Sequence, residues 1–270
     1  MLRQRRPRRI SGLSINKLIP NILTLLALCA GLTSIRFGLH QKWEMAVFSI
    51  VLAGLLDGLD GRVARLLQGT SKFGAELDSL SDFVSFGVAP AMLLYFWSMQ
   101  RAGGIGWALV LLYAVCMAMR LARFNTMIGA PDLPSWAYNF FTGVPAPAAA
   151  GLVLLPMMFS FQLEQFEFFA YPIVNGAMLV LVSFLMVSKI PTFSGKRFRV
   201  PHQYVLPMML LMALMAAFLV TAPWTTVAGM ALIYGATIPL SAASFAKLKK
   251  QAETLRGEEE PKSDENHTKA

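Results

Sequence analysis

Charged side chains are scarce in this chain. They make up 14% of its 270 residues, while 56% of the residues are hydrophobic and the mean hydropathy is +0.54. Soluble domains carry roughly a quarter charged residues. Apolar runs of about 20 residues, the length that crosses the hydrocarbon core of a bilayer, recur along the sequence. The composition therefore excludes an ordinary soluble domain and indicates a polytopic membrane protein.

Strand-like alternation of apolar and polar residues is also absent, which argues against a transmembrane barrel. Helices remain, because a backbone exposed to lipid must satisfy its own hydrogen bonds. We predict an all-α fold with eight transmembrane helices and no second soluble domain. The predicted spans fall near residues 18–39, 43–67, 73–99, 105–124, 143–161, 168–188, 204–221 and 224–246. The only two cysteines, Cys29 and Cys116, lie inside these spans, where we expect them to act as small packing residues.

Basic residues are distributed unevenly between the predicted loops. If both termini are cytoplasmic, all but three of the 24 Lys and Arg residues lie on the cytoplasmic side of the eight spans. The exceptions are Arg36, Lys42 and Arg101. This asymmetry is what the positive-inside rule expects. We therefore predict that both termini are cytoplasmic and that the protein lies in the inner membrane of the cell.

The same reasoning divides the chain into three parts. They are a basic cytoplasmic segment 1–17, a transmembrane domain 18–246, and a polar, unstructured cytoplasmic tail 247–270. The net charge of +9 follows from the positive-inside bias and from the arginine-rich start. No basic and aromatic groove pattern accompanies these arginines, so we predict no nucleic-acid partner.

Acidic residues number only 15, and five of them fall in one short stretch. Four of the five are aspartates. Asp57 and Asp60 are three residues apart, and Asp78 and Asp82 are four apart, so on helices each pair shares one face. The polar segment 68–74 between the pairs can turn the chain back. Two antiparallel helices would then present two carboxylates each to one another.

Four converging carboxylates repel one another unless cations lie between them. The cluster contains neither His nor Cys, and donors that are all oxygen suit Mg²⁺ or Mn²⁺ better than zinc. A carboxylate within hydrocarbon is costly and indicates function. The alternative interpretation is structural, with polar helix ends held by ion pairs to Arg62, Arg65 and Lys72.

Small residues and one arginine lie beside the aspartates. Gly61 and Ala64 leave room for a bulky ligand to approach the first helix, and Gly74 leaves room on the facing helix. Arg65 follows Gly61 by one turn, where its guanidinium can bind a phosphate in bidentate fashion. Mg²⁺ is commonly shared between a few carboxylates and the phosphates of a substrate. The pattern therefore predicts a substrate that carries phosphate.

Taken together, these residues match a known signature, D-x-x-D-G-x-x-A-R followed after eight residues by G-x-x-x-D-x-x-x-D. The matching residues, without departure, are Asp57, Asp60, Gly61, Ala64, Arg65, Gly74, Asp78 and Asp82. In this the chain resembles the CDP-alcohol phosphatidyltransferase family. The resemblance implies a helical membrane enzyme that transfers a substituted phosphoryl group from a CDP-linked donor to an alcohol, with release of CMP.

The resemblance also implies roles for individual residues. All four aspartates become ligands of a site for two divalent cations, Mg²⁺ or Mn²⁺, and Asp82 is also the base that takes the proton of the acceptor hydroxyl. The CDP-diacylglycerol donor is bound by Gly61, Ala64, Arg65, Ser71 and Gly74. No Ser, Cys or His next to the cluster offers an obvious nucleophile, which favours direct attack by the alcohol.

The segment PNILT in the first predicted span is similar to the family's Pro-Asn-x-x-Thr segment. It makes Asn21 and Thr24 further candidates for binding the nucleotide of the donor. From the residues alone, Asn21 is equally well a helix cap next to Pro20.

The acceptor is predicted from three further stretches that resemble the members of the family that use serine. They are LDSLSDFVSFGVAPA from Leu77, RLARFN from Arg120, and FTGVPAPAAA from Phe141. Arg120 and Arg123 can bind the carboxylate of serine, and the carbonyl of Asn125 can accept from its ammonium group. Alternatively, both arginines are interfacial anchors that follow the positive-inside bias.

We therefore expect CDP-diacylglycerol and L-serine as substrates, an active site that faces the cytoplasm and, by resemblance, a homodimer in the bilayer. Alternative acceptors are glycerol phosphate, inositol phosphate and choline. A cation-coupled transporter is a further alternative, although such proteins place carboxylates near the bilayer midplane and often contain an inverted repeat. Gly143, Pro145 and Pro147 either shape the acceptor pocket or end a loop.

Overall fold

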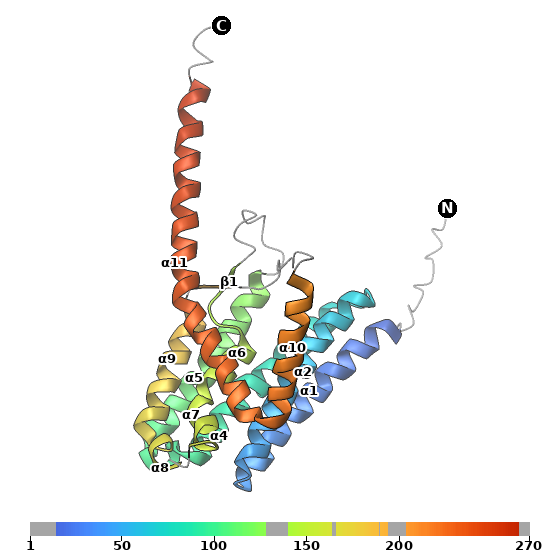
Figure 1. Cartoon of the computed structure of the whole chain (residues 1–270), viewed down its shortest axis with the longest axis vertical. Coiled ribbons are helices and arrows are strands. Elements are labelled where there is room, and N and C mark those ends of the chain that lie inside the picture. The colour runs from blue at the N-terminus through green and yellow to red at the C-terminus, as the bar shows by residue number, and fades with distance from the viewer. Residues whose placement is uncertain (1–14, 128–139, 164–165, 189, 194–203, 265–270) are drawn as a thin grey trace, which may run out of the picture. The chain divides into compact units, whose positions relative to one another are not determined.

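The structure is a computed structural model and describes residues 15–127, 140–163, 166–188, 190–193 and 204–264. The chain divides into two compact units, residues 1–121 and 122–270. Every predicted span contains helix (Figure 1). The prediction of an all-α fold is confirmed for the described residues, apart from two strands of three residues each.

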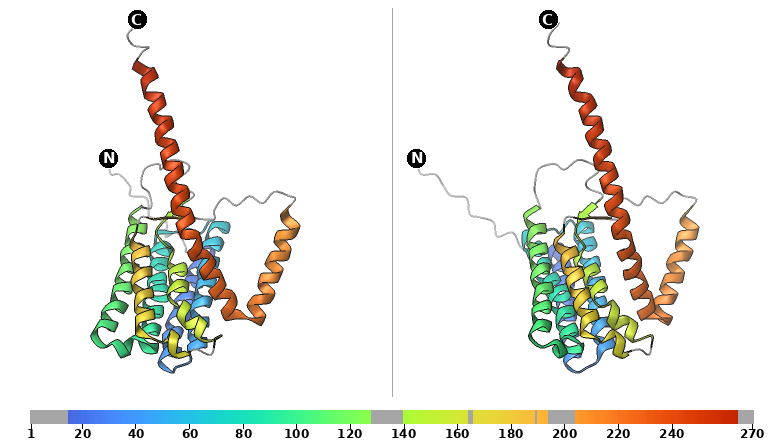
Figure 2. Two further views of the ribbon diagram at one scale, coloured as in Figure 1. Left: turned by 60° about the vertical axis from the view of Figure 1, so that its left-hand side comes forward. Right: turned by 90° about the vertical axis from the view of Figure 1, so that its left-hand side faces the viewer.

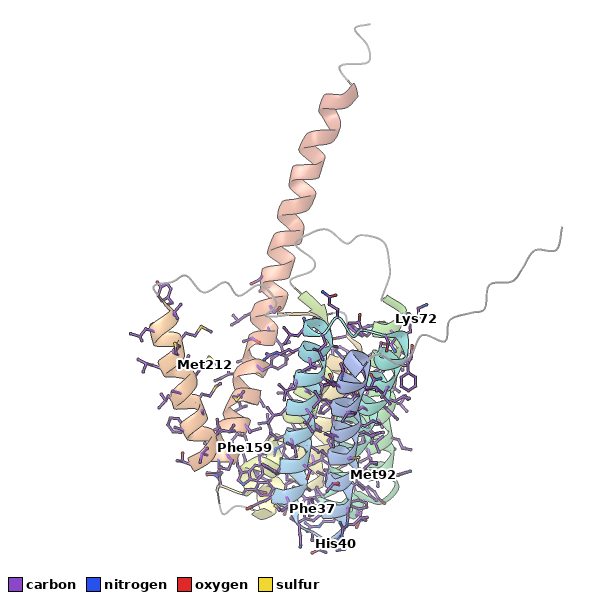
Figure 3. All side chains as sticks on the ribbon, turned by 90° about the vertical axis from the view of Figure 1, so that its right-hand side faces the viewer. Phe37, His40, Lys72, Met92, Phe159 and Met212 are labelled. Atoms are coloured by element: carbon purple, nitrogen blue, oxygen red, sulfur yellow. The ribbon has the colours of Figure 1, made fainter. Side chains whose placement is uncertain are left out.

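The first unit contains the segments that carry the predicted site. They are α1 (Ile15–Leu39), α2 (Trp43–Leu66), α3 (Lys72–Asp82), a π-helical turn η1 (Phe83–Val88), α4 (Ala89–Trp97), a 3₁₀ turn η2 (Met99–Ala102) and most of α5 (Gly103–Met127). α1 packs along α2 and also contacts the continuous helical stretch formed by α3, η1 and α4. Lys72, at the start of α3, lies at the opposite end of this bundle from Phe37 and His40 (Figure 3).

Small residues allow α1 to approach η1 and α4 closely. A Cβ on Gly31 would lie 2.8 Å from Cα of Ser85, and one on Gly38 would collide with the side chain of Leu93. The hydroxyl of Ser85 donates to the carbonyl of Ala27 at 3.2 Å. Small residues and short polar side chains of this kind are typical of helix interfaces within membranes, where backbones must approach closely.

The second unit contains two short antiparallel strands, β1 (Phe140–Thr142) and β2 (Pro191–Phe193). Its further helices are α6 (Ala146–Val153), α7 (Leu155–Ser160), α8 (Phe166–Phe169), α9 (Pro172–Val187), α10 (Val205–Thr221) and α11 (Pro223–Asp264). α6 packs against α9 and α11, and α10 turns directly into α11 (Figure 2).

The structure favours the second interpretation of Gly143, Pro145 and Pro147, in which these residues end a loop. Pro145 is the extended residue before α6, and Pro147 lies in the first turn of that helix. Gly143 has a positive φ of 78° and donates its N–H to the carbonyl of Ile190 at 2.9 Å. A proline tolerates the first turn of a helix because the N–H that it lacks has no partner there.

The C-terminal segment differs from the sequence prediction. Residues from 247 onward are predicted to be unstructured, but α11 continues through Asp264. The stretch AKLKKQAETLR is rich in Ala, Lys, Gln, Glu, Leu and Arg, which have the highest helix propensities. The polarity of this stretch excludes a packed core. It is compatible with a polar helix that continues the apolar first part of α11.

Within the described residues, three helical segments are long and apolar enough to cross a membrane, namely Leu18–Leu39, Lys72–Trp97 and Met99–Thr126. Two apolar helices, Pro172–Val187 and Val205–Thr221, are shorter. Large apolar side chains are exposed on α1, α5 and α10, as expected of surfaces that face lipid. The number of eight spans and the position of the termini stay predictions.

Replacement of Gly31 by Ala is expected to lower the thermal stability of the detergent-solubilised protein. The added Cβ meets the backbone of Ser85, and overpacking of this kind costs about 1–3 kcal/mol. Gly104→Ala is the matched control, because a Cβ at this helical glycine meets no atom within 4 Å. Equal melting temperatures for the two variants would contradict the close packing of α1 against η1.

Candidate active site

The turn between α2 and α3 brings the two aspartate pairs together, as the sequence predicts. Gln68 adopts a positive φ of 50°, and the N–H of Gly69 donates to the carbonyl of Ala64 at 2.9 Å. Ser71 caps α3 by accepting from the N–H of Gly74 at 3.0 Å. The chain therefore reverses within a few residues and presents Asp57 and Asp60 to Asp78.

Three of the four carboxylates form a compact cluster. Oxygen atoms of Asp57, Asp60 and Asp78 all lie within 4.8 Å of one another. The side chain of Asp57 also contacts that of Asp82. At this separation each pair of ionised carboxylates repels by about 3 kcal/mol at an effective dielectric constant of about 20. The ionised cluster therefore needs added positive charge or protons.

The protein itself does not supply that charge through the ion pairs of the structural alternative. Among the described residues, no ion pair joins these aspartates to Arg62, Arg65 or Lys72. Atom Oδ1 of Asp78 is buried and has no hydrogen-bond partner in the described part of the chain. A buried acceptor without a donor, beside two further carboxylates, fits a hard divalent cation that binds oxygen. Asp57, Asp60 and Asp78 could thus hold a metal ion.

Thr24, which is predicted to bind the nucleotide, also contacts a carboxylate of the aspartate cluster. Its hydroxyl lies 2.5 Å from Oδ2 of Asp60 and 3.1 Å from the carbonyl of Pro20. Thr24 and Asp60 are only 3% and 5% exposed. The hydroxyl therefore orients a carboxylate of the cluster, in the way that groups behind a metal ligand usually do. The PNILT segment gave no sign of this contact, because α1 and α2 meet only in the folded protein.

Asn21 is not a helix cap, which was the alternative for this residue. α1 begins at Ile15, so Asn21 lies inside the helix. Its Oδ1 atom occupies the space next to Gly74, where a Cβ would lie only 2.8 Å away. Gly74 therefore leaves room for a polar side chain of α1 at the same place where a ligand is expected to enter.

A cavity of about 250 Å³ opens beside the cluster. All seven residues predicted to bind the donor line it, namely Asn21, Thr24, Gly61, Ala64, Arg65, Ser71 and Gly74. Asp60 and Asp78 also line it, together with residues that the sequence reasoning missed, Pro20, Gly69, Thr70 and Ala75. Gly69 and Thr70 belong to the polar turn segment, whose composition predicts only a chain reversal.

Arg65 gives this cavity a positive group at its wall. Its Nε–H donates to the carbonyl of Gly61 at 2.9 Å, which fixes the guanidinium along its own helix. Neither terminal NH₂ group has a hydrogen-bond partner in the part of the chain that the structure describes, so both can bind a ligand. The cavity thus combines carboxylates that could hold a cation with an arginine whose charge suits an anion, an arrangement suited to a metal-bound diphosphate.

Asp82 lies one helical turn beyond Asp78 and is not part of the cavity lining. Its neighbours are Asp57, Asp78 and Arg120 of α5, whose positive charge acts on it. The first unit therefore brings one of the three predicted serine-binding residues next to the predicted base.

The other two residues predicted to bind serine, Arg123 and Asn125, belong to the second unit. The guanidinium of Arg123 donates to the carbonyls of Val187 at 3.0 Å and Ser188 at 3.4 Å. These carbonyls belong to the end of α9, where the helix itself supplies no donors. Arg123 therefore has a structural contact that neither the serine-binding nor the anchor interpretation anticipated.

Comparisons with known proteins identify the family of this chain. The family model of the CDP-alcohol phosphatidyltransferases matches residues 17–187, and a second model, CDP-alcohol phosphatidyltransferase 2, matches residues 203–239. The chain belongs to the CDP-alcohol phosphatidyltransferase family. It is thus a transferase, and this membership removes the transporter alternative.

Three relatives of this chain share the name CDP-diacylglycerol–serine O-phosphatidyltransferase. The CDP-diacylglycerol–serine O-phosphatidyltransferase of Mycobacterium tuberculosis is 40% identical over 243 residues, which cover 88% of this chain and 82% of the relative. The protein of the same name from Helicobacter pylori is 42% identical over 173 residues, 64% of this chain and 70% of the relative. That from Bacillus subtilis is 36% identical over 172 residues, 64% of this chain and 88% of the relative.

Replacement of Thr24 by Val is expected to weaken Mn²⁺ binding about tenfold to a hundredfold, the usual effect of removing a group that orients a metal ligand. Titration followed by electron paramagnetic resonance measures the affinity directly. Thr33→Val is the matched control, because Thr33 lies on the same helix and donates only to the carbonyl of Cys29 at 2.7 Å. Equal Mn²⁺ affinities for both variants would show that the Thr24–Asp60 contact has no role in metal binding.

Proposed function

We propose that this protein transfers the phosphatidyl group of CDP-diacylglycerol to the hydroxyl of L-serine, giving phosphatidylserine and CMP. The observation that carries the proposal is the cavity in the first unit. It joins the seven residues predicted to bind the donor with two carboxylates of the aspartate cluster. The shared name of the relatives from three bacteria supports serine as the acceptor.

The donor binds with its diphosphate between the aspartate cluster and Arg65. Gly61 and Gly74 let it approach both helices, while Ser71 and Asn21 offer polar contacts to the nucleotide. Exposed apolar residues of α1, among them Ile22 and Leu25, lie on the helix that lines the cavity and offer the acyl chains a path into lipid. Two divalent cations, Mg²⁺ or Mn²⁺, supply charge neutralisation of the diphosphate when bound.

Asp82 accepts the proton of the serine hydroxyl, as a general base does. The hydroxyl oxygen forms a bond to the phosphorus that carries diacylglycerol, and the bond from that phosphorus to the bridging oxygen breaks. The electron pair of this bond leaves with CMP. Attack is direct in this proposal, because the two serines that neighbour the aspartates in the sequence, Ser79 and Ser81, donate their hydroxyls to the backbone carbonyls of Ala75 and Thr24.

Arg120 provides the reason to choose serine among alcohols. In serine, a carboxylate lies only a few bonds from the hydroxyl, so the acceptor needs a cation close to the base. Arg120 is the electrostatic neighbour of Asp82. A phosphorylated acceptor would call for a denser basic cluster. We assign Arg123 to the end of α9 on the basis of its hydrogen bonds, and keep Asn125 as a candidate ligand of the serine ammonium group.

The setting of the reaction is part of the proposal. We propose eight spans within the domain 18–246, cytoplasmic termini formed by residues 1–17 and 247–270, and a homodimer in the inner membrane with its active site facing the cytoplasm. The distribution of Lys and Arg supports this orientation. The three long apolar helices support insertion in the bilayer.

Purified protein supplied with CDP-diacylglycerol and Mn²⁺ is expected to release CMP with L-serine. It is not expected to do so with glycerol 3-phosphate, an inositol phosphate or choline, each tested separately. EDTA should abolish turnover, because among the described residues no ion pair neutralises Asp57, Asp60 or Asp78. Chromatography of the lipid product identifies phosphatidylserine. Turnover with another alcohol and none with serine would overturn the acceptor, and full turnover in EDTA would overturn the metal site.

Replacement of Arg120 by Gln is expected to raise the KM for serine and leave the KM for CDP-diacylglycerol unchanged. A charge-assisted hydrogen bond contributes about 1.5–3 kcal/mol, which corresponds to roughly tenfold to a hundredfold in KM. Arg123→Gln, on the same helix, is the comparison variant. It should lower the melting temperature, because it removes two hydrogen bonds to α9, and should leave the serine KM unchanged. The reverse pattern would move acceptor binding from Arg120 to Arg123.

A further inference from the structure

A π-helical turn follows Asp82 directly in the chain. Asp82 is the last residue of α3, and η1 runs from Phe83 to Val88 before α4 begins. Within it the N–H of Ala89 donates to the carbonyl of Val84, five residues earlier. Wide turns of this kind are rare and are frequent at functional sites.

Pro90 gives a physical reason for the wide turn. A proline inside a helix has no N–H for the carbonyl four residues earlier, and its ring clashes with that carbonyl. The carbonyl in question is that of Phe86. A wide turn relieves a clash of this kind, and because Pro90 has no N–H, the Phe86 carbonyl lacks the donor that it would have in a regular α-helix.

Tyr113 of α5 donates to that carbonyl. Its hydroxyl lies 2.9 Å from the carbonyl oxygen of Phe86, 27 residues away in the chain. The tyrosine is fully buried, at 0% exposure. A buried hydroxyl without a partner is costly, so this contact favours one arrangement of the turn over others.

The same face of α5 continues toward Asp82. Tyr113, Met117 and Arg120 are spaced by four and three residues, so they lie on one face of the helix. Met117 packs against the turn, because a Cβ on Gly87 would lie 2.9 Å from its Cγ. Arg120 is the electrostatic neighbour of Asp82. One face of α5 therefore contacts the π-helical turn and also reaches Asp82, the residue that precedes the turn.

α1 holds the turn from another direction. Ser81 donates to the carbonyl of Thr24 at 3.1 Å and Ser85 to that of Ala27 at 3.2 Å. Ser85 also lies against Gly31. Residues on both sides of Asp82 are thus fixed to α1, while the turn itself is fixed to α5 by Tyr113.

We propose that Tyr113 is a positioning residue for the transfer reaction. Tyr113 holds the Phe86 carbonyl in the wide turn that Pro90 requires. The geometry of this turn then determines how the side chain of Asp82 is oriented. This inference rests on the proposed function, in which Asp82 takes the proton of the acceptor. Tyr113 touches no substrate and acts only through the backbone between Phe86 and Asp82.

The test is Tyr113→Phe, which removes one hydroxyl and keeps the ring. We expect kcat, measured at saturating CDP-diacylglycerol, serine and Mn²⁺, to fall about tenfold to a hundredfold, the effect of a small misplacement of a catalytic group. Both KM values should stay within about twofold of the parent. Tyr95→Phe is the matched control. Tyr95 lies in α4 of the same unit, where its ring packs against Phe96 and Trp107.

A cycle with Asp82→Asn separates positioning from general loss of structure. In the Asp82→Asn background, Tyr113→Phe should change the residual kcat by less than about twofold, because the group that it positions is already inactive. A merely structural role predicts the same fall in both backgrounds, and that result overturns the inference.

The activity of Asp82→Asn distinguishes a wrong role for Tyr113 from a wrong assignment of the base. If Asp82→Asn keeps the parent kcat, the base has been assigned wrongly, and the inference falls with it. If Asp82→Asn loses activity and Tyr113→Phe does not, only the inference is overturned. Should Tyr113→Phe not fold, Gly87→Ala disturbs the same turn through Met117. The inference then requires a fall in kcat at unchanged KM values, and an unchanged kcat overturns it.

Discussion

Mutual repulsion between carboxylates is the constraint on which the rest of this structure depends. Asp57, Asp60 and Asp78 lie within 4.8 Å of one another, inside a bundle whose outer surface is apolar. Such a cluster is unfavourable as a purely structural element, because removal from water and like charge both oppose ionisation. A bound divalent cation would compensate this repulsion. Without a bound cation, the fold therefore holds together carboxylates that repel one another when they are ionised.

The neighbouring elements are organised around that cluster. The short turn capped by Ser71 brings α3 back along α2, and α1 supplies Thr24 to orient Asp60. Gly61 leaves open space at the cavity, whereas Gly74 leaves room for the side chain of Asn21. Arg65 is fixed to its own helix by the Gly61 carbonyl, so its terminal groups are available without a search through many rotamers. Preorganisation of this kind lowers the cost of binding a charged ligand.

α5 contacts both Asp82 and the π-helical turn η1. It carries Arg120 beside Asp82 and Tyr113 beside the π-turn, on the face that also buries Met117. The opposite face exposes residues such as Leu112 and Val115. One helix thus combines a surface suited to lipid with contacts that concern the reaction. Its last residues lie in the second unit, where Arg123 binds the end of α9.

The sequence by itself determined the helices, the turn after α2 and the identity of the clustered aspartates. Each of these follows from local information: apolar runs, polar breaks and spacings of three or four residues that define a helix face. For the segment after residue 247, low hydropathy predicts no structure, whereas its composition has high helix propensity and α11 continues through Asp264. Only the tertiary structure decided which groups meet across the bundle. The Thr24–Asp60 contact joins residues 36 apart, the Tyr113–Phe86 contact 27 apart and the Arg123–Val187 contact 64 apart. Such contacts depend on how helices pack and rotate against one another, and no spacing within a single helix encodes that.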